Sequence, residues 1–375
     1  MGRPRAEGLQ SSVTGAVDCS VLMPVYNEER EIAASVAAMQ SQRFSGRLEF
    51  LVADGGSVDG TREILERLAQ EDDRIRIFDN PRRAASSGLN VALGHARGRW
   101  VARMDAHTRY PDDYIARGVA RLQAGGTRWV SGPPIATGQG PVSRAVALAL
   151  RSPLGRGGSR KWAAERSGEE AEYELDAGVF AGVWERETVI GYAGWDEDWL
   201  RNQDSEMAGR FLANGERLIC LPGMAAEYTP RDSLPSLWRQ YYQYGQYREK
   251  TAARHPHTMR RSHLLAPGVV LALAVSVAAP ARLRFLARFG IAVYLVAVCG
   301  AGVRALRDAE NPTDAAFVPA VLVVMHLAHG AGTLDGAARF GPPTAAVAGA
   351  LGLKGLAARL EPARQPVAAP SLTTA

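Results

Sequence analysis

The sequence predicts a doubly wound α/β domain followed by a C-terminal helical region that lies in a membrane. Up to about residue 263, short apolar runs alternate with amphipathic stretches, which is the pattern of strands and helices around a mostly parallel sheet. Beyond that point, long apolar segments with few charges follow one another, and such segments are typical of membrane helices. The 375 residues are sufficient for both parts.

The α/β part is predicted from four apolar runs and the stretches between them. The runs predict strands at 19–25, 48–53, 75–78 and 99–104. Helical spacing of apolar residues predicts helices at 27–42, after the glycine turn at 55–56, and at 86–98. Ligands of such sheets bind at the carboxyl ends of the strands. The segments DGGS (54–57) and DAH (105–107) each follow a strand, and ordinary turns explain the pair less well than either one alone.

Three apolar segments, 264–281, 289–303 and 315–333, are predicted membrane helices, since about 20 apolar residues span a bilayer. A fourth run, 344–353, is short and rich in alanine. A buried helical domain is the alternative interpretation, because alanine contributes little to membrane insertion. The basic link at 282–288 conflicts with a simple hairpin, so the sequence leaves the topology open. We expect about three transmembrane helices within residues 264–355.

The segment that precedes these helices, 236–263, combines arginines and a lysine with several tyrosines. This composition predicts an interfacial segment on the cytoplasmic side. The protein is therefore expected to be a multi-pass protein of the inner or cell membrane with its α/β domain in the cytoplasm. The tails 1–17 and 356–375 are expected to be disordered. A balance of 44 basic and 39 acidic residues is too even for a protein that coats nucleic acid.

Four motifs occur in order along the chain: VLMPVYNEE (21–29), VADGGSVDGT (52–61), SGLNVALGHARGRWVARMDAH (87–107) and GWDEDWLRNQDSEMAGR (194–210). Through them the chain, over about residues 18–250, resembles the family 2 glycosyltransferases, which are inverting enzymes with a GT-A nucleotide-diphosphosugar domain. DGGS, RMDAH and the apolar tail are most similar to the succinoglycan-type, ExoA-like branch. One such motif is weak evidence, whereas four in register are specific.

The resemblance implies a GT-A domain over 18–235 that moves a hexose from a nucleoside diphosphate sugar, such as UDP-glucose, to a lipid-linked glycan. The product would belong to an exopolysaccharide or a cell-envelope polysaccharide. Two alternatives are transfer directly onto polyprenyl phosphate and a catalytically silent GT-A scaffold in the membrane. Three carboxylates at matching strand and helix ends, Asp54, Asp105 and Asp204, oppose the silent scaffold.

The donor site is carried over from the first two motifs. By the resemblance, Pro24, Tyr26 and Glu28 contact the nucleoside, with Tyr26 supplying an aromatic face. Asp54 accepts a hydrogen bond from the base or the ribose. Gly55 permits a tight turn, but it replaces the second acid of the commoner DDGS pattern, so the sequence leaves the base undetermined.

The third motif adds further predicted donor contacts, Arg83, Gly88 and Asn90. An arginine at this place could bind phosphate through two parallel hydrogen bonds, although a solvated surface position for Arg83 is nearly as compatible with the sequence. Arg103 and Arg109 flank the acidic motif, where they could contact phosphate or pair with acids.

Asp105 and His107 are the predicted metal ligands, and Asp105 is also counted among the donor contacts. A divalent cation held by them would neutralise the leaving diphosphate. His107 replaces the second acid of the family's Asp-x-Asp pattern, and imidazole suits Mn²⁺ better than Mg²⁺. We therefore expect manganese, with magnesium as the alternative. Without the other motifs, Asp-x-His at a strand end would more often be a hydrogen-bonded turn.

Asp204 is the predicted general base for the acceptor hydroxyl. It matches the Asp of the family's Glu-Asp pair, whose first acid is Gln203 here, and a single displacement assisted by one base inverts the anomeric centre. Asp196, Gly178 and Gly182 are predicted to line the acceptor site. Asp196 and three further acids of the same cluster are alternative candidates for the base. Those three acids are expected to face solvent: Glu197, Asp198 and Glu206.

Processive synthases of the family carry Gln-x-x-Arg-Trp near the membrane. Here the segment QYGQYRE offers Gln243, Gln246 and Arg248 without the tryptophan. This departure favours the addition of one sugar per encounter over polymerisation.

Overall fold

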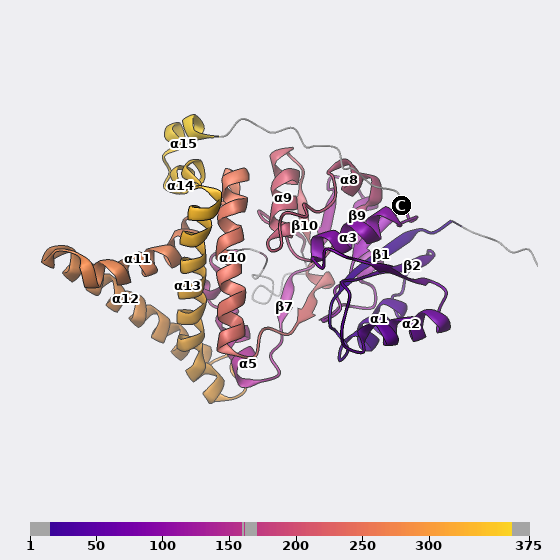
Figure 1. Ribbon diagram of the computed structural model, residues 1–375, viewed down its shortest axis with the longest axis horizontal. Coiled ribbons are helices and arrows are strands. Elements are labelled where there is room, and N and C mark those ends of the chain that lie inside the picture. The colour runs from indigo at the N-terminus through magenta and orange to yellow at the C-terminus, as the bar shows by residue number, and fades with distance from the viewer. Residues whose placement is uncertain (1–15, 160, 162–170, 362–375) are drawn as a thin grey trace, which may run out of the picture.

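A computed structural model describes residues 16–159, 161 and 171–361. Figure 1 shows a domain built around a sheet beside a group of long helices. The main sheet has eight strands in the order β3-β2-β1-β4-β9-β6-β10-β8. Their bounds are β1 (Cys19–Val25), β2 (Leu48–Asp54), β3 (Ile75–Asp79), β4 (Trp100–Arg103), β6 (Trp129–Ser131), β8 (Tyr173–Glu174), β9 (Gly182–Glu185) and β10 (Leu218–Cys220). A smaller sheet contains β5 (Thr108–Arg109), β11 (Ala226–Tyr228) and β7 (Pro134–Ala136).

The main sheet is mixed. Strands β3, β2, β1 and β4 run parallel, whereas β9 is antiparallel to its neighbours β4 and β6. The four strands expected from the sequence are all present, each within one or two residues of its predicted bounds. Their apolar runs are almost wholly buried, as expected for strands that helices cover on both faces.

Alternate residues of β1 serve two separate cores. Val21 and Met23 pack in the core below α1 (Ile32–Gln40), α2 (Thr61–Glu71) and α4 (Tyr114–Gln123). Leu22 points to the opposite core, because successive strand residues face opposite sides of a sheet. That second core is covered by α3 (Ala85–Gly94), α8 (Arg186–Gly191) and α9 (Gln203–Ala213). Met207 and Phe211 of α9 are fully buried in it.

The remaining helices follow the sheet or are inserted between its strands. Their bounds are α5 (Pro141–Arg151), α6 (Pro153–Arg156), α10 (Leu234–Arg254), α11 (Leu265–Ala278), α12 (Ala281–Ala305), α13 (Pro312–Phe340), α14 (Thr344–Ala350) and α15 (Lys354–Leu360), with 3₁₀ turns at Pro222–Met224, Pro256–Thr258 and Arg261–Leu264. Helix α10 lies between the sheet domain and α13 (Figure 1). Helices α11 and α12 extend away from the sheet domain on the far side of α13 (Figure 1).

Helices α10 and α13 pack closely because glycines lie at their contact. A Cβ at Gly332 would come within 2.0 Å of the carbonyl oxygen of Tyr242, and one at Gly245 within 2.2 Å of that of His329. Small residues of this kind let two helix backbones approach each other. Helix α13 is therefore held closely against α10.

Three helical segments are long and apolar enough to cross a membrane: Arg261–Ala278, Ala281–Ala305 and Pro312–Phe340. Half of the apolar window in the third segment is buried against other helices, but only 11% is buried in each of the first two. On α12, Phe285 and Val296 are 70% and 73% exposed. Exposed apolar surface of this extent requires a lipid or protein partner.

Three expectations about boundaries differ from the structure. The basic link 282–288 is the first part of α12, which begins directly after Pro280. The helix expected from residue 27 begins only at Ile32, because the loop before it is bound to the neighbouring loop, as described below. Residues 354–360 form α15, so the expected disordered tail does not begin at 356. Residues 1–15 and 362–375 lie outside the described residues.

Candidate active site

The predicted site residues gather at one edge of the main sheet. Parallel pairing places Val25 of β1 beside Asp54 of β2, and Leu22 beside Arg103 of β4. Three parallel strands therefore end together, and the loops that follow them share this edge. The motifs that contain Tyr26, Asp54 and Asp105 are neighbours in space for this reason.

The loops after β1 and β2 are bound to each other by exchanged hydrogen bonds. The backbone N–H of Asn27 donates to Ser57 Oγ (2.9 Å), and that of Val58 donates to Asn27 Oδ1 (2.9 Å). Asn27 adopts a φ of 56°, a left-handed conformation that asparagine tolerates. The N–H of Glu28 donates to Thr61 Oγ1 (2.8 Å). These bonds occupy the backbone that would otherwise start α1 earlier.

Asp54 is buried at the end of β2, with 3% of its surface exposed. Its Oδ1 accepts hydrogen bonds from the N–H (3.1 Å) and the hydroxyl (2.6 Å) of Ser57, and Arg62 lies 3.6 Å from its Oδ2. A Cβ at Gly55 would lie 3.2 Å from the Tyr26 ring, so glycine leaves room for that ring, which is 43% exposed. The tyrosine is placed on the DGGS turn with one face accessible.

A buried arginine links the two carboxylates that were predicted to act on the substrate. Arg103 donates to both oxygens of Asp105, from Nε (2.7 Å) and Nη2 (2.9 Å), and to Asp204 Oδ1 from Nη1 (2.6 Å). The arginine is 4% exposed, whereas Asp105 and Asp204 are 14% and 17% exposed. Of the two roles left open for Arg103, the structure shows pairing with acids. One residue thus fixes the predicted metal ligand and the predicted base relative to each other.

Asp204 lies in the first turn of α9, on the side that faces β4. Burial raises its pKa to about 6, and the nearby charge of Asp105 acts in the same direction while Arg103 opposes it. A carboxylate with this pKa is largely ionised at neutral pH and is a stronger base than an ordinary aspartate. Asp204 therefore has the protonation behaviour that a general base requires.

His107 is exposed on the loop that follows β4, and its Nδ1 lies 3.0 Å from Glu28 Oε1. The hydrogen bond to Glu28 raises the pKa of His107, and the charge of Arg231 opposes this rise. Glu28, predicted to contact the nucleoside, is thus also the partner of the predicted metal ligand. The backbone N–H of Asp105 donates to Tyr110 Oη (2.9 Å), which holds the loop between them.

The predicted metal ligands Asp105 and His107 each keep lone pairs beyond those used in their hydrogen bonds. Within the described part of the chain, no group of three or more His, Cys, Asp and Glu side chains is arranged to enclose a metal ion. A cation that also takes oxygens from a diphosphate and from water needs few protein ligands. Each oxygen of Asp105 accepts one bond from Arg103 and keeps a second lone pair, and His107 keeps its Nε2. One carboxylate and one imidazole therefore fit a shared site of this kind.

Three of the predicted donor residues have different surroundings. Arg83 is exposed, and its guanidinium lies beside Gly56 of the DGGS turn, a position compatible with phosphate contact. Gly88 is buried against Pro24, where a Cβ would lie 3.1 Å from the proline Cβ. It thus lets α3 pack closely on β1.

Asn90 also has a structural role. Its amide nitrogen donates to the carbonyl oxygen of Trp195 (2.7 Å) and to Glu197 Oε1 (2.9 Å), and its oxygen accepts from the N–H of Trp195 (2.9 Å). The side chain binds the fourth motif to α3 and has no donor hydrogen left for a nucleotide. A donor contact by Asn90 therefore stays a prediction, one that would have to use its amide oxygen or replace a bond to the loop that carries Trp195 and Glu197.

The residues predicted to line the acceptor site also make contacts within the protein. A Cβ at Gly182 would lie 2.5 Å from the indole nitrogen of Trp129, so this glycine faces the core. A Cβ at Gly178 would lie 2.2 Å from the carbonyl oxygen of Asp204. Gly178 thus lets its loop pack against the start of α9, next to the backbone of Asp204. Asp196 forms an ion pair with Arg254 (2.6 Å).

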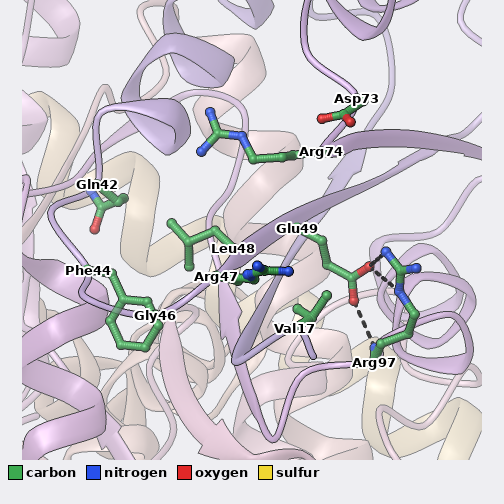
Figure 2. Close-up of a pocket in the computed structure, with 10 residues that line it drawn as sticks. All are labelled: Val17, Gln42, Phe44, Gly46, Arg47, Leu48, Glu49, Asp73, Arg74 and Arg97. Atoms are coloured by element: carbon green, nitrogen blue, oxygen red, sulfur yellow. Dashed lines mark hydrogen bonds and ion pairs between the residues drawn. The ribbon is translucent and has the colours of Figure 1, made fainter. Parts of the chain in front are cut away.

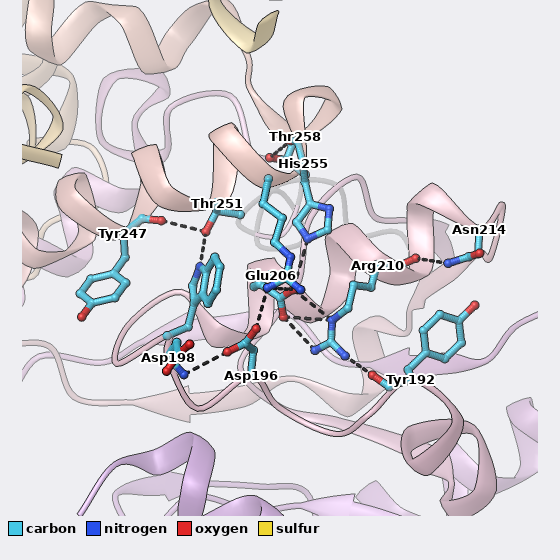
Figure 3. Close-up of polar contacts among 12 residues, drawn as sticks. Tyr192, Asp196, Asp198, Glu206, Arg210, Asn214, Tyr247, Thr251, His255 and Thr258 are labelled. Atoms are coloured by element: carbon cyan, nitrogen blue, oxygen red, sulfur yellow. Dashed lines mark hydrogen bonds and ion pairs between the residues drawn. The ribbon is translucent and has the colours of Figure 1, made fainter. Parts of the chain in front are cut away.

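Glu206 was expected to face solvent, but it is completely buried (Figure 3). Both of its oxygens accept hydrogen bonds from Arg210, at 2.8 to 3.0 Å, and His255 Nε2 lies 3.2 Å from Oε1. Arg210 also donates to the backbone carbonyl oxygens of Tyr192 and Gly194. The helical i, i+4 spacing of Glu206 and Arg210 was visible in the sequence, but their burial was not.

A separate pocket lies at the opposite edge of the sheet, where β1 and β2 begin. Figure 2 shows Glu49 there, bound by Arg97. Glu49 also accepts a hydrogen bond from Ser20 Oγ (2.7 Å). These bonds occupy the buried carboxylate, and the pocket is removed from the loops that carry the four motifs.

Comparisons with a family model and with individual proteins both find glycosyltransferases or proteins of polysaccharide biosynthesis. The family model "Glycosyl transferase family 2" matches residues 20–169. The succinoglycan biosynthesis protein ExoA of Rhizobium meliloti (strain 1021) is 33% identical over 314 residues, covering 83% of this chain and 92% of that protein. A UDP-Glc:alpha-D-GlcNAc-diphosphoundecaprenol beta-1,3-glucosyltransferase of Escherichia coli, WfgD, is 36% identical over 88 residues, covering 23% of this chain and 34% of that protein.

Among solved structures, the mannosyltransferase PcManGT from Pyrobaculum calidifontis, in complex with GDP-Man and Mn²⁺, is similar to this chain. The TM-score is 0.56 at 20% identity, and the match covers 86% of this chain and 88% of that one. The fold is thus GT-A, with C-terminal helices apolar enough to span a membrane.

Proposed function

The chain belongs to glycosyltransferase family 2, in its ExoA-like group, and from this premise we propose that it extends a lipid-linked glycan by one hexose. The donor would be a nucleoside diphosphate sugar, and the product a precursor of exopolysaccharide or another envelope polysaccharide. The name of the Rhizobium relative supports the pathway class, and the name of the Escherichia relative supports an acceptor linked to diphosphoundecaprenol. The apolar helices support anchoring in the membrane, with the GT-A domain on the cytoplasmic side.

The observation that carries this proposal is the pairing of Asp105 and Asp204 through Arg103. In the proposed reaction, Asp204 accepts the proton of an acceptor hydroxyl while the hydroxyl oxygen attacks the anomeric carbon. The bond from that carbon to the diphosphate oxygen breaks, and its electron pair leaves with the nucleoside diphosphate. A single displacement of this kind inverts the anomeric centre. A divalent cation bound by Asp105 and His107 would stabilise the charge of the leaving diphosphate.

The base at Asp204 favours a hydroxyl acceptor over polyprenyl phosphate. A phosphate monoester loses its second proton with a pKa of about 6, so its oxygen is already ionised at neutral pH and needs no base. A sugar hydroxyl is not ionised at that pH and gains from proton removal in the transition state. A carboxylate kept at a pKa of about 6 is therefore more useful for a lipid-linked sugar.

The test is release of nucleoside diphosphate by the full-length protein with Mn²⁺ and a panel of UDP- and GDP-sugars. We expect one donor to be turned over with a lipid diphosphate-linked sugar as acceptor and not with bare polyprenyl phosphate. Asp105→Ala and Asp204→Ala should each remove this turnover. Unchanged turnover in both variants would refute the mechanism, and turnover with bare lipid phosphate would identify the alternative acceptor.

A further inference from the structure

A second group of positive charges lies where α9, α10 and the first apolar segment meet. Arg248 on α10 is placed with its Nη2 3.4 Å from Ser205 Oγ, and Ser205 directly follows the proposed base in α9. The other terminal nitrogen of Arg248, Nη1, is buried and has no hydrogen-bond partner among the described residues. Buried donors are nearly always satisfied in folded proteins, so this nitrogen indicates a missing acceptor.

Two buried arginines differ from Arg248, which is only partly buried as a whole residue. Arg103 is paired with two carboxylates, and Arg210 with Glu206 and two backbone carbonyls. For Arg248, the described part of the chain provides a serine hydroxyl but no carboxylate within 4.0 Å. Burial of the Nη1 end of a guanidinium without a counter-ion is costly, and an anionic ligand would offset that cost.

Arg260 brings a second guanidinium to this region and connects it with the apolar helices. It precedes the 3₁₀ turn Arg261–Leu264, after which α11 begins at Leu265. Arg260 is paired with Asp176, so it is less deprived of a partner than Arg248. Its position marks the level at which the chain leaves the GT-A domain and becomes apolar, which corresponds to the headgroup level of a bilayer.

Positive charges lie close enough here to affect one another's pKa values, although the carboxylates of Asp204, Asp176 and Glu249 oppose that effect. Burial lowers the pKa of Arg248 to about 10, and the charge of Arg260 adds to this effect. Burial likewise lowers the pKa of Lys161 to about 8, and the charge of Arg248 is the next largest cause of this decrease. Like charges that depress one another's pKa values are stabilised when an anion binds between them.

We propose that Arg248, assisted by Ser205 and Arg260, binds a phosphate of the lipid-linked acceptor beside the base Asp204. This inference rests on the proposed function and adds the part of the acceptor that the enzyme recognises. A guanidinium binds phosphate oxygens through two parallel hydrogen bonds, and the first turn of α9 adds a favourable dipole. The lipid chain would lie along the exposed apolar faces of α11 and α12, with the first sugar next to Asp204.

The experiment measures binding of farnesyl diphosphate to the full-length protein in nanodiscs of phosphatidylcholine. We expect Arg248→Gln and Arg260→Gln to weaken binding at least about tenfold, the loss expected for a charge-assisted hydrogen bond, and Arg248→Lys to restore part of it. Binding of UDP with Mn²⁺ should be unchanged in all three variants. Arg67→Gln, which removes an exposed arginine of α2, is the matched control and should bind both ligands like wild type.

Three further ligands separate the possible sources of the phosphate. Farnesol should bind poorly, and inorganic pyrophosphate should bind more weakly than farnesyl diphosphate but with the same dependence on Arg248. Displacement of farnesyl diphosphate by phosphatidylglycerol in the nanodisc would overturn the proposal in favour of bulk anionic lipid. Equal weakening of UDP binding in Arg248→Gln would assign the arginine to the donor diphosphate.

The outcome can be separated from that of the proposed function. Farnesyl diphosphate binding that depends on Arg248, in a protein that turns over no nucleotide sugar, would refute the proposed reaction and keep the anion site. If the protein turns over a nucleotide sugar but Arg248→Gln leaves farnesyl diphosphate binding unaffected, the proposed reaction is kept and the anion site is refuted. Thermal unfolding of each variant confirms that the folded protein is being compared.

Discussion

Two carboxylates in the first turn of α9, Asp204 and Glu206, have opposite surroundings. Burial raises the pKa of Asp204 to about 6. Glu206 is more deeply buried, but its bonds to His255 and Arg210 outweigh the effect of burial and lower its pKa. Carboxylates whose pKa values are driven apart by their surroundings commonly divide into acid–base and structural roles. One helix thus carries the proposed base and a carboxylate held by structural bonds, with pKa values shifted in opposite directions.

The two arginines that serve these carboxylates differ in the same way. Arg210 and Glu206 are 6% and 0% exposed, and the arginine also binds two backbone carbonyl groups. Arg103 is equally buried, but the carboxylates it holds keep 14% and 17% exposure. The first cluster is closed, and the second retains oxygens that a substrate can reach. Burial of a charge pair alone is thus not a sign of catalysis.

Among the substitutions that test this comparison, Asp204→Asn is expected to have the largest effect, which is on turnover. The amide keeps the size of the side chain but cannot accept the hydroxyl proton, so turnover should fall by about 10² to 10⁴-fold. Donor binding and thermal stability should stay near wild type. Nucleotide release, UDP titration and a melting curve measure the three properties. A variant that lost its fold along with its activity would place Asp204 in the same class as Glu206.

Glu206→Ala should damage stability instead. It leaves the buried Arg210 without its carboxylate, and removal of one partner of a buried pair costs about 3–5 kcal/mol. Denaturant unfolding measures this loss. Asp113→Ala breaks another i, i+4 ion pair, the one between Asp113 and Arg117, whose side chains are 26% and 51% exposed. This substitution should cost about 1 kcal/mol or less. Equal costs for the two substitutions would contradict the structural role of Glu206.

The pH dependence of activity should follow the protonation of Asp204. Protonation below its pKa of about 6 removes the base, so activity should fall about tenfold per pH unit on the acid side. Glu206 has a lowered pKa, so its contribution to stability is present above the unfolded value of about 4.3 and is lost only as pH falls through its lower folded value. A rate profile and a melting curve between pH 7 and 5 should therefore diverge, and coincident losses would refute the assignment.

The smallest effect is expected from His107→Asp, which creates the Asp-x-Asp pattern. Replacing imidazole with carboxylate should shift the activity ratio with Mn²⁺ and Mg²⁺ toward magnesium, because harder oxygen ligands suit it better. Parallel titration with the two metals measures the ratio. An unchanged ratio would mean that His107 serves only as the partner of Glu28 and that Asp105 is the protein ligand.

By itself the sequence determined the framework of the catalytic domain. Apolar runs with clear boundaries predicted β1, β2, β3 and β4 within one or two residues, because strand formation there follows from local pattern and burial on both faces. It also placed Asp54 and Asp105 at the same edge of the sheet, after β2 and β4, which lie on either side of β1, since parallel strands share one carboxyl edge. Apolar length alone was enough to predict three segments that can cross a membrane.

Only the tertiary structure decided which polar side chains remain available. Asn90 was predicted to bind the donor, yet it is bound by a loop more than a hundred residues away in sequence. Glu206 was expected in solvent and is buried, whereas Arg103 joins two motifs and Arg248 has a buried nitrogen without an acceptor. Hydrogen bonds and ion pairs between distant segments depend on how the elements pack, and no local pattern in the chain records that packing.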